Sequence, residues 1–398
     1  MPEAAAFDGL ADGPTERLTL PGLVASHAAT RPDARFLVTD TDVCTYGDLA
    51  AATARVVAAL HRRGVGRGTR VGVLMPNGID WAVVALGVMR SGAVLVPLST
   101  FLRPPELAAQ LRTAGIECLV LAPEFRGRDF VADLAAVAPG VRIDAGDQLL
   151  DALPRLRTVV TPDAFLAAAD AEWDPGVDGG LVTARDATVR PADDLVVIFT
   201  SGSRGVPKGV VHTHGGALGA VAASLGPRCI GPDTRMYIPM PFFWMGGFGG
   251  GLLSVLVAGA ALVTEAEPEP VATLALLERE RVTLFRGWPD QATALASHPA
   301  FATTDLSSLR PGSLDGVLPA DLRRPPGARS NLFGMTESFG PYCADPLDRD
   351  LPEGAWGSCG RPFAGVEVRI VDVDSGTEVA PGATGEIQLS GPNLMRGI

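Results

Sequence analysis

Residues 195–209 read LVVIFTSGSRGVPKG, a short apolar run that passes directly into a loop rich in glycine, hydroxyl and basic side chains. The run at 195–199 predicts a buried strand, because it is uncharged and rich in β-branched residues. The loop offers an anion close approach to the backbone, hydroxyl donors and positive charge. These groups belong to Thr200, Ser201, Gly202, Ser203, Arg204, Gly205 and Lys208. The pattern predicts a phosphate-binding loop, although it lacks the GxxxxGK[ST] spacing of a Walker A loop.

Strand-like and helix-like runs alternate on both sides of this loop. Strands are predicted at 70–75, 93–97, 118–122, 195–199, 260–264 and 283–285. Helices are predicted at 49–61, 80–90, 106–114, 216–225 and 272–281, whereas the polar stretch at 172–192 is predicted to be irregular. Such alternation with short connections predicts an α/β fold with mainly parallel sheets covered by helices. From about residue 354, short alternating runs between Gly and Pro turns predict a small antiparallel β-barrel.

The composition excludes several classes of protein. The chain has 398 residues, 47% hydrophobic and 20% charged, as expected of a globular protein and not of a disordered one. Its net charge of -12 argues against nucleic-acid binding, which needs clustered Lys and Arg. The five cysteines are scattered without a CxxC pair, which indicates free thiols in a reducing compartment and not a metal site. The acidic N-terminus is not a secretory signal, and the apolar stretch at 250–263 is too short to span a bilayer, so a cytoplasmic protein is predicted.

Three further segments accompany the loop, namely NLFGMTE at 331–337, GSCGRP at 357–362 and GEIQLSGPNLMRG at 385–397. Together they resemble the adenylate-forming superfamily of acyl- and aryl-CoA synthetases, nonribosomal peptide synthetase adenylation domains and luciferases. The usual family forms are TSGTTGxPKG, NxYGxTE and GxxGRP. The chain departs from these forms at Ser203 and Arg204, where the family has threonines, and at Phe333, where it usually has Tyr. The resemblance covers nearly the whole chain and implies two mainly parallel sheets sandwiched by helices (layered αβαβα) plus a small distorted antiparallel β-barrel.

The resemblance also implies roles for individual residues. Phe333 would stack on adenine, Thr336 would bind the α-phosphate or the substrate carboxylate, and Glu337 would help to hold Mg²⁺. Lys208, Thr336 and Glu337 are therefore the predicted catalytic residues. The sequence at 313–319 stands where the family has a turn beside the adenine, with Asp315 in place of Gly. Outside the phosphate-binding loop, the predicted nucleotide contacts are Asp315, Gly316, Val317, Asn331, Leu332, Phe333, Gly334, Met335 and Thr336.

The segment PMPFFWMGGF at 239–248 resembles the family's acid pocket. Many relatives have His where this chain has Trp244. No charged residue occurs between 237 and 254, so an apolar acid is favoured over an amino acid, whose buried ammonium would need a carboxylate. The glycines suggest room for a fatty or polycyclic acid, although some of the aromatic residues could also be ordinary core. The predicted acid-binding residues are Phe242, Phe243, Trp244, Met245, Gly246 and Gly247.

The implied reaction is activation of a carboxylic acid by MgATP to an acyl-adenylate and pyrophosphate, followed by transfer to CoA. Two alternatives stay open, namely an adenylation domain that loads a carrier protein and a noncatalytic nucleotide-binding module. His212 and His214, which follow the loop, are expected to be structural, with His214 as a candidate helix cap. The oligomeric state is open, with a homodimer as one option.

The resemblance implies a large N-terminal domain with subdomains at about 1–190, 191–340 and 341–398. In relatives the sequence continues to a ribose-binding Asp, a hinge and a small C-terminal domain with an essential Lys. We therefore expect this chain to lack that lid and to be impaired in both half-reactions on its own.

Overall fold

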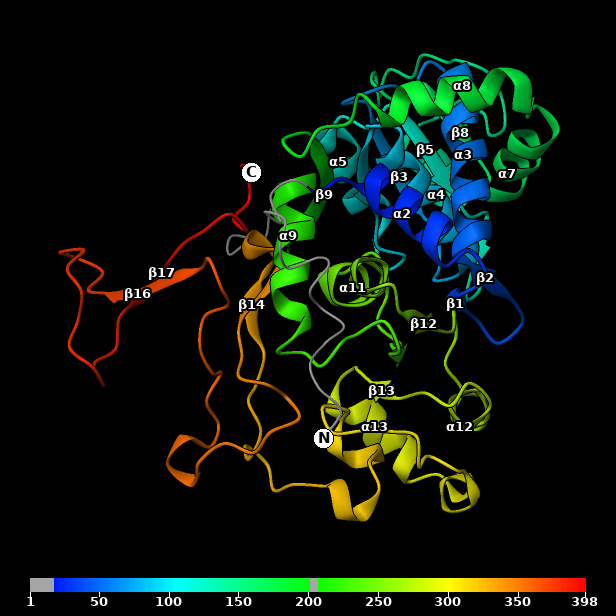
Figure 1. The fold of residues 1–398 in the computed structure, drawn as a ribbon. Coiled ribbons are helices and arrows are strands. Elements are labelled where there is room, and N and C mark those ends of the chain that lie inside the picture. Colours follow the sequence, from blue (N-terminus) through cyan, green and yellow to red (C-terminus); the bar gives the residue numbers. More distant parts are fainter. Residues whose placement is uncertain (1–17, 201–206) are drawn as a thin grey trace.

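The computed structural model describes residues 18–200 and 207–398, which form two sheets with helices around and between them (Figure 1). The larger sheet has six strands in the spatial order β10-β9-β4-β3-β5-β8. All neighbours in it are parallel except β9 and β10. The strands span β3 (Arg70–Leu74), β4 (Val94–Pro97), β5 (Cys118–Leu121), β8 (Thr158–Val160), β9 (Asp194–Thr200) and β10 (Lys208–Thr213).

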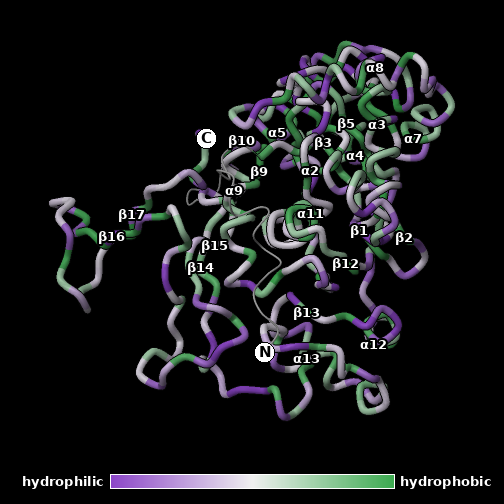
Figure 2. The backbone as a smooth tube through the Cα atoms, in the orientation of Figure 1, coloured by the Kyte–Doolittle hydropathy of each residue, from purple (hydrophilic) through white to green (hydrophobic). Residues whose placement is uncertain are grey.

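The smaller sheet has five strands in the order β13-β11-β12-β1-β2, with one antiparallel pair between β1 and β2. The strands are β1 (Arg35–Val38), β2 (Val43–Thr45), β11 (Arg235–Tyr237), β12 (Ala261–Val263) and β13 (Leu284–Phe285). The prediction of two mainly parallel sheets is therefore confirmed. Figure 2 shows that hydrophobic residues dominate strands β9, β3 and β5, as expected of strands covered on both faces.

A layer of helices separates the two sheets. Helix α4 packs on β3 and β4 of the larger sheet, α11 packs on β12 of the smaller sheet, and α2 contacts both α4 and α11. The helices that surround the sheets are α2 (Leu20–Thr30), α3 (Tyr46–Arg62), α4 (Ile79–Arg90), α5 (Pro104–Ala114), α6 (Phe130–Val137), α7 (Pro162–Ala171), α8 (Pro175–Asp186), α9 (His214–Leu225), α11 (Ser254–Ala258), α12 (Pro270–Arg279) and α13 (Pro289–Ala296). None of the described helices is long and apolar enough to cross a membrane.

Helix α8 contradicts the prediction that residues 172–192 are irregular. Asp174 caps the helix by accepting a hydrogen bond from the Gly176 amide, and Pro175 occupies the first position of the helix. The helix packs on α3, where buried Asp178 pairs with Arg62 and Val182 is buried. Three glycines lower the intrinsic helix propensity of this segment, so the sequence pattern is weak and tertiary packing stabilises the helix.

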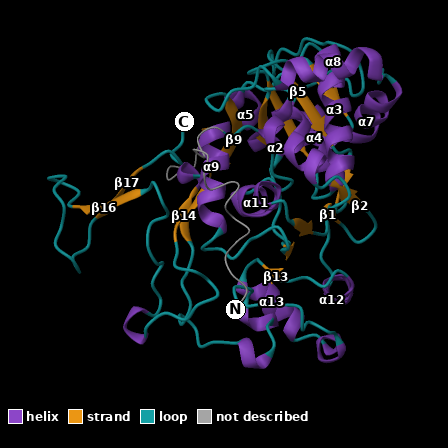
Figure 3. Ribbon diagram, viewed as in Figure 1, coloured by secondary structure: helices purple, strands orange, loops and turns teal. Residues whose placement is uncertain are grey.

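The C-terminal part also differs from its prediction. It contains long loops and short strands, as Figure 3 shows. Strands β16 (Glu367–Val371) and β17 (Glu386–Ser390) pair antiparallel as an isolated two-stranded ribbon, and the described residues of 341–398 do not close into a barrel. In these two strands only Val371 is buried, and Val368, Ile370, Gln388 and Leu389 are half-buried.

Candidate active site

Strands β9 and β10 hold the two ends of the phosphate-binding loop beside each other. Thr200 ends β9 and pairs in register with Lys208, which begins β10. Gly209 is required here because a Cβ at this position would lie 2.8 Å from Val197 Cγ1. Lys208 is exposed and is the only lysine in the 398-residue sequence. The other predicted loop contacts, Ser201, Gly202, Ser203, Arg204 and Gly205, lie outside the described residues.

The strand that begins at Lys208 meets two segments that are distant in sequence. His212 on β10 places Nε2 at 2.7 Å from the carbonyl oxygen of Thr336. The carbonyl oxygen of Glu337 accepts a hydrogen bond of 2.8 Å from the Met395 amide. Residues 396–397 in turn pair with Val211 on β10. The structure therefore joins three of the segments singled out from the sequence in one hydrogen-bonded junction.

Two buried histidines lie at the start of this junction, and His212 contacts it directly. Burial lowers the pKa of His212 to about 4, so its imidazole is neutral and Nε2 donates to the Thr336 carbonyl. Its ring packs edge-on against Phe339 at 4.9 Å between ring centroids. His214, whose pKa burial also lowers to about 4, accepts a hydrogen bond at Nδ1 from the Leu20 amide. His214 does not cap α9, because Thr213 caps that helix through Oγ1, but it accepts a hydrogen bond from the amide at the first position of α2.

These histidines predict a loss of stability in mild acid. In the unfolded chain both pKa values return to about 6.5, so below that pH the unfolded state binds protons that the folded state does not. The free energy of unfolding should therefore decrease as the pH drops from 6.5 towards 4, by up to about 1.4 kcal/mol per pH unit for each histidine. Urea unfolding at pH 7, 6 and 5 measures this slope. In His212→Gln and His214→Asn, which keep a polar group but cannot titrate, the slope should become shallower, and an unchanged slope in both variants would contradict the assignment.

The predicted adenine segment forms a short antiparallel pair, β14 (Phe333–Met335) with β15 (Gly340–Cys343). Gly334 is required because a Cβ there would lie 2.1 Å from the carbonyl oxygen of Gly340. Phe333 is 40% exposed with its ring edge-on to Tyr342 at 5.5 Å, and Leu332 and Met335 are also exposed. The ring is thus accessible to a flat partner, as the predicted stacking on adenine requires.

The GSCGRP segment forms hydrogen bonds with the residue that leads into β14. The Asn331 amide donates to the Ser358 carbonyl at 3.0 Å, and its side chain donates to the Gly357 carbonyl at 3.3 Å. The predicted neighbours at 315–317 form a short helical turn. In this turn, Asp315 Oδ1 lies 3.4 Å from Arg329 Nη1. Gly316 packs on Ala292, and Val317 is buried. Contact of these three residues with adenine stays a prediction.

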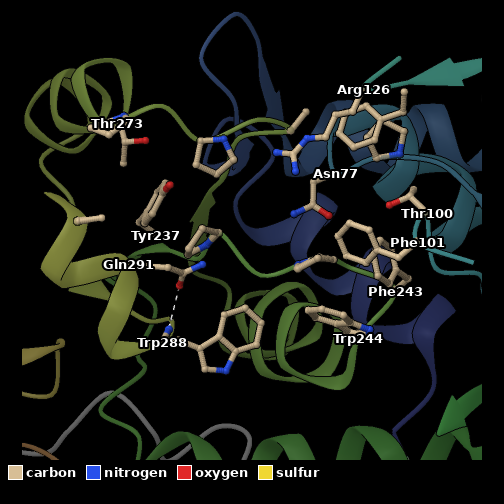
Figure 4. A pocket seen from close by; sticks show the side chains of 18 of the residues that line it. Asn77, Thr100, Phe101, Arg126, Tyr237, Phe243, Trp244, Thr273, Trp288 and Gln291 are labelled. Atoms are coloured by element: carbon tan, nitrogen blue, oxygen red, sulfur yellow. Dashed lines mark hydrogen bonds between the residues drawn. The ribbon is translucent and has the colours of Figure 1, made fainter. Parts of the chain in front are cut away.

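A cavity of about 420 Å³ lies beside the predicted acid segment (Figure 4). Phe243 and Trp244 line it, together with Phe101 and Trp288, which the sequence did not single out. The four rings pack against one another. The ring centroid of Phe101 lies 5.8 Å from those of Phe243 and Trp244, and the centroid of Trp244 lies 5.7 Å from that of Trp288. Phe242 instead packs in the core, 5.2 Å from Trp81. The cavity therefore has aromatic walls, contributed by the segments that follow β4 of the larger sheet and β11 and β13 of the smaller sheet.

The glycines of this segment do not leave the room that the sequence suggested. A Cβ at Gly246 would lie 2.5 Å from Met240 Sδ, and one at Gly247 would lie 2.2 Å from the Pro241 carbonyl oxygen. Met245 Sδ likewise lies 2.8 Å from a Cβ built at Gly249. The chain's own atoms occupy these positions, so the glycines allow close packing of the 239–253 segment, and the argument for a wide pocket from them is wrong.

The structure also places charges that the sequence pattern did not reveal. Arg228 is buried behind the uncharged segment, where it donates to the Gly250 carbonyl and, at 2.8 Å, to Ser254 Oγ. Burial lowers its pKa to about 9, so it stays protonated at neutral pH. At the cavity itself, Arg126 and the amide side chains of Asn77 and Gln291 join the aromatic walls. These residues come from separate loops with no motif in common, and therefore only the fold reveals them.

A divalent cation fits the junction only together with phosphate. The described residues contain no group of three or more His, Cys, Asp or Glu side chains that could hold a metal alone. Mg²⁺ is commonly bound by one or two carboxylates plus substrate phosphates, so the half-buried carboxylate of Glu337 beside a nucleotide meets that requirement.

Known proteins resemble this chain over nearly its whole length. Residues 24–398 match the AMP-binding enzyme family. The chain is 32% identical over 394 residues to 3-[(3aS,4S,7aS)-7a-methyl-1,5-dioxo-octahydro-1H-inden-4-yl]propanoyl:CoA ligase of Mycobacterium tuberculosis, covering 95% of this chain and 72% of that protein. It is 34% identical over 361 residues to feruloyl-CoA synthase of Amycolatopsis sp., covering 89% of this chain and 66% of that protein.

Solved structures share the fold. The N-terminal domain of FACL13 from Mycobacterium tuberculosis superposes with a TM-score of 0.75 at 21% identity, covering 95% of this chain and 90% of that one. The anthranilate CoA ligase AuaEII superposes with a TM-score of 0.74 at 23% identity, covering 97% of this chain and 71% of that one. The two mainly parallel sheets are thus a known architecture.

Proposed function

Since this chain belongs to the AMP-binding enzyme family, we propose that it activates a carboxylic acid with ATP to an acyl-adenylate and passes the acyl group to the thiol of CoA. The observation that carries this proposal is the junction of the Lys208 strand with the Thr336–Glu337 segment. The relatives named above as CoA ligases support CoA as the acceptor. A carrier protein as the acceptor remains the alternative, and a comparison of CoA with a phosphopantetheinyl carrier protein would separate the two.

In the proposed first step, a carboxylate oxygen of the acid attacks the α-phosphorus of ATP, an O–P bond forms and pyrophosphate leaves. Lys208 would neutralise charge that develops on the phosphates, and the Thr336 hydroxyl would orient the α-phosphate or the attacking carboxylate. Mg²⁺ held by Glu337 would supply further charge neutralisation when bound. In the second step, the CoA sulfur attacks the acyl carbon, the acyl–phosphate bond breaks and AMP leaves.

We propose a ring-bearing apolar acid as the substrate. The aromatic walls of the cavity suit a ring, because aromatic pairs gain from edge-to-face contact beyond the area they bury. The acids in the names of three relatives carry rings, namely the indenyl-propanoyl:CoA ligase and the feruloyl-CoA synthase described above and 4-coumarate--CoA ligase 2 of Oryza sativa subsp. japonica. A fatty acid, which the sequence also allowed, is the alternative substrate, and the palmitoyl analogue in the titration tests it.

Calorimetric titration of this chain with acyl-sulfamoyl-adenosine analogues tests the proposal. Acetyl, palmitoyl and cinnamoyl analogues share the nucleotide and differ only in the acyl group. We expect the cinnamoyl analogue to bind about 100-fold more tightly than the acetyl analogue, as burial of one additional ring provides. Equal affinity for acetyl and cinnamoyl would contradict the ring acid, and tightest binding of palmitoyl would favour the fatty acid. If a folded chain binds no analogue, the proposed adenylation is wrong.

A further inference from the structure

A single charged residue lines the aromatic cavity. Of the residues that bound this cavity in the described part of the chain, only Arg126 is charged. Its guanidinium packs over the ring of Phe125, which also lines the cavity, with the guanidinium carbon 5.2 Å from the ring centroid. Figure 4 shows this side chain extending from its loop towards Asn77. The cavity wall therefore combines large apolar rings with one positive charge.

The guanidinium keeps hydrogen-bond donors for a ligand. Among the described residues, none accepts a hydrogen bond from it, and its one ion-pair partner is Glu267, whose Oε2 lies 3.5 Å from Nε. The two side chains are 47% and 57% exposed, so water screens the pair and it holds Arg126 only weakly. The N–H groups on Nη1 and Nη2 can therefore donate to a molecule in the cavity.

The backbone at Arg126 is a second sign of a role beyond folding. Strands β6 (Glu124–Phe125) and β7 (Arg128–Asp129) form a hairpin whose two-residue turn, Arg126–Gly127, has φ angles of 51° and 72°. Positive φ at both central residues is typical of a type I′ turn, which favours Asn-Gly. Arginine is rare in this region, and strained backbone positions cluster at ligand sites. The turn thus contains a residue that does not favour its conformation, and the side chain of that residue lines the cavity.

The opposite side of the cavity is nearer to the predicted chemistry. Trp244 lines that side and is followed directly by Met245, whose Cγ lies 3.7 Å from the Cβ position of Gly340. Gly340 belongs to β15, which pairs with the predicted adenine segment β14. In Figure 4, Arg126 lies across the cavity from Trp244. An acid whose carboxyl group faces the junction would thus direct its far end towards Arg126.

We propose that Arg126 donates hydrogen bonds to an uncharged acceptor, a carbonyl oxygen, on the part of the acid farthest from the activated carboxyl group. Glu267 already balances the charge of the guanidinium, so a second carboxylate would be repelled by it. A distal hydrocarbon group would displace water from the guanidinium without replacing its hydrogen bonds. The inference rests on the proposed function and narrows its substrate class to ring-bearing acids with a distal carbonyl group.

Three acyl-sulfamoyl-adenosine probes test this specificity. The 4-acetylcinnamoyl (ketone), 4-isopropenylcinnamoyl (alkene) and 4-carboxycinnamoyl (carboxylate) probes have para groups of similar size and shape. In calorimetric titration of this chain, the ketone probe should bind about 10-fold more tightly than the alkene probe, as expected for a hydrogen bond from a charged group. Equal affinities of these two, or tightest binding of the carboxylate probe, would overturn the inference and leave the adenylation proposal standing. Binding of none would instead contradict adenylation itself.

Substitution of Arg126 identifies the group responsible. Arg126→Asn creates the Asn-Gly pair that a type I′ turn favours, so the variant should unfold at the same or a higher urea concentration than the wild type. Without the guanidinium, the preference for the ketone over the alkene probe should disappear. Arg55→Gln removes another half-exposed arginine, which pairs with Asp170 and does not line the cavity, and should keep the preference. An unchanged preference in folded Arg126→Asn would overturn the inference.

Substitution of Glu267 tests why the acceptor is uncharged. Glu267→Gln removes the carboxylate that balances Arg126 and leaves the guanidinium in place. The carboxylate probe should then bind about 5-fold more tightly than it binds the wild type, as expected for removal of one like charge a few ångströms away in a water-exposed site. The ketone probe should keep its advantage over the alkene probe. An unchanged affinity for the carboxylate probe would overturn the assignment of an uncharged acceptor.

Discussion

Replacement of Lys208 by alanine should lower the rate of acyl-adenylate formation by this chain about 100- to 1,000-fold. Lys208 begins β10 opposite Thr200, so it directly follows the predicted phosphate-binding loop and its exposed side chain is free to meet a ligand there. Removal of one group that stabilises charge in a transition state typically costs two to three orders of magnitude in rate. Single-turnover measurement of adenylate formed from MgATP and the acid identified by titration would test this value. Lys208→Arg keeps the charge and should lose less than Lys208→Ala.

The presence of a single lysine in the sequence allows a chemical test of Lys208. Because Lys208 is the only lysine, acetylation of side-chain amines modifies a single position. Acetylated chain should show the loss seen in Lys208→Ala, and ATP should slow the modification. Lys208→Arg chain, treated in the same way, controls for acetylation of the N-terminal amine and should keep its rate. Full activity of the acetylated wild-type chain would show that Lys208 does not contact the reacting phosphates.

The sequence predicted best where one local pattern was sufficient. The run at 195–199 is β9 extended by one residue at each end, and the predicted helix at 80–90 is α4. Both are long or strongly apolar, so their burial is visible in the pattern itself. Helix α8 was missed because its stability comes from contact of Asp178 with Arg62 on another helix. Local propensity contains no information about such a contact.

In the candidate site too, local sequence revealed some residues, whereas others depend on contacts that only the fold creates. The segments at 331–337 and 357–362 were recognisable from their residues, and the hydrogen bonds of Asn331 show why they occur together. The burial of Glu265 was not recognisable, since a single Glu between a strand and a helix is usually exposed. Its two hydrogen bonds come from Tyr237 and Thr273, which only the fold brings to it. The glycines at 246–247 suggested space for a ligand, but the structure uses their missing side chains for close packing of the chain itself.

Replacement of Trp81 by alanine should cost about 3–5 kcal/mol of unfolding free energy and weaken binding of the cinnamoyl analogue. Trp81 on α4 is fully buried, with its ring edge-on to Phe242 at 5.2 Å and to Phe248 at 6.1 Å between centroids. Trp81 therefore holds the 242–248 segment in place by packing on its two phenylalanine rings. Loss of a buried Trp side chain leaves a cavity that the surrounding core cannot fill. Urea unfolding gives the first quantity and calorimetric titration the second.

Two further variants separate packing from hydrogen bonding at Trp81. Its Nε1 has no hydrogen-bond partner among the described residues, so Trp81→Phe sacrifices no hydrogen bond and keeps much of the contact with Phe242 and Phe248. We expect Trp81→Phe to cost less than about 2 kcal/mol and to bind the analogue nearly as well as the wild type. Trp356→Ala removes a 44% exposed ring that packs on neither Phe242 nor Phe248 and should change analogue binding little. If Trp81→Ala and Trp81→Phe unfold at the same urea concentration, the ring does not support the 242–248 segment through packing, because the alanine variant alone removes those contacts.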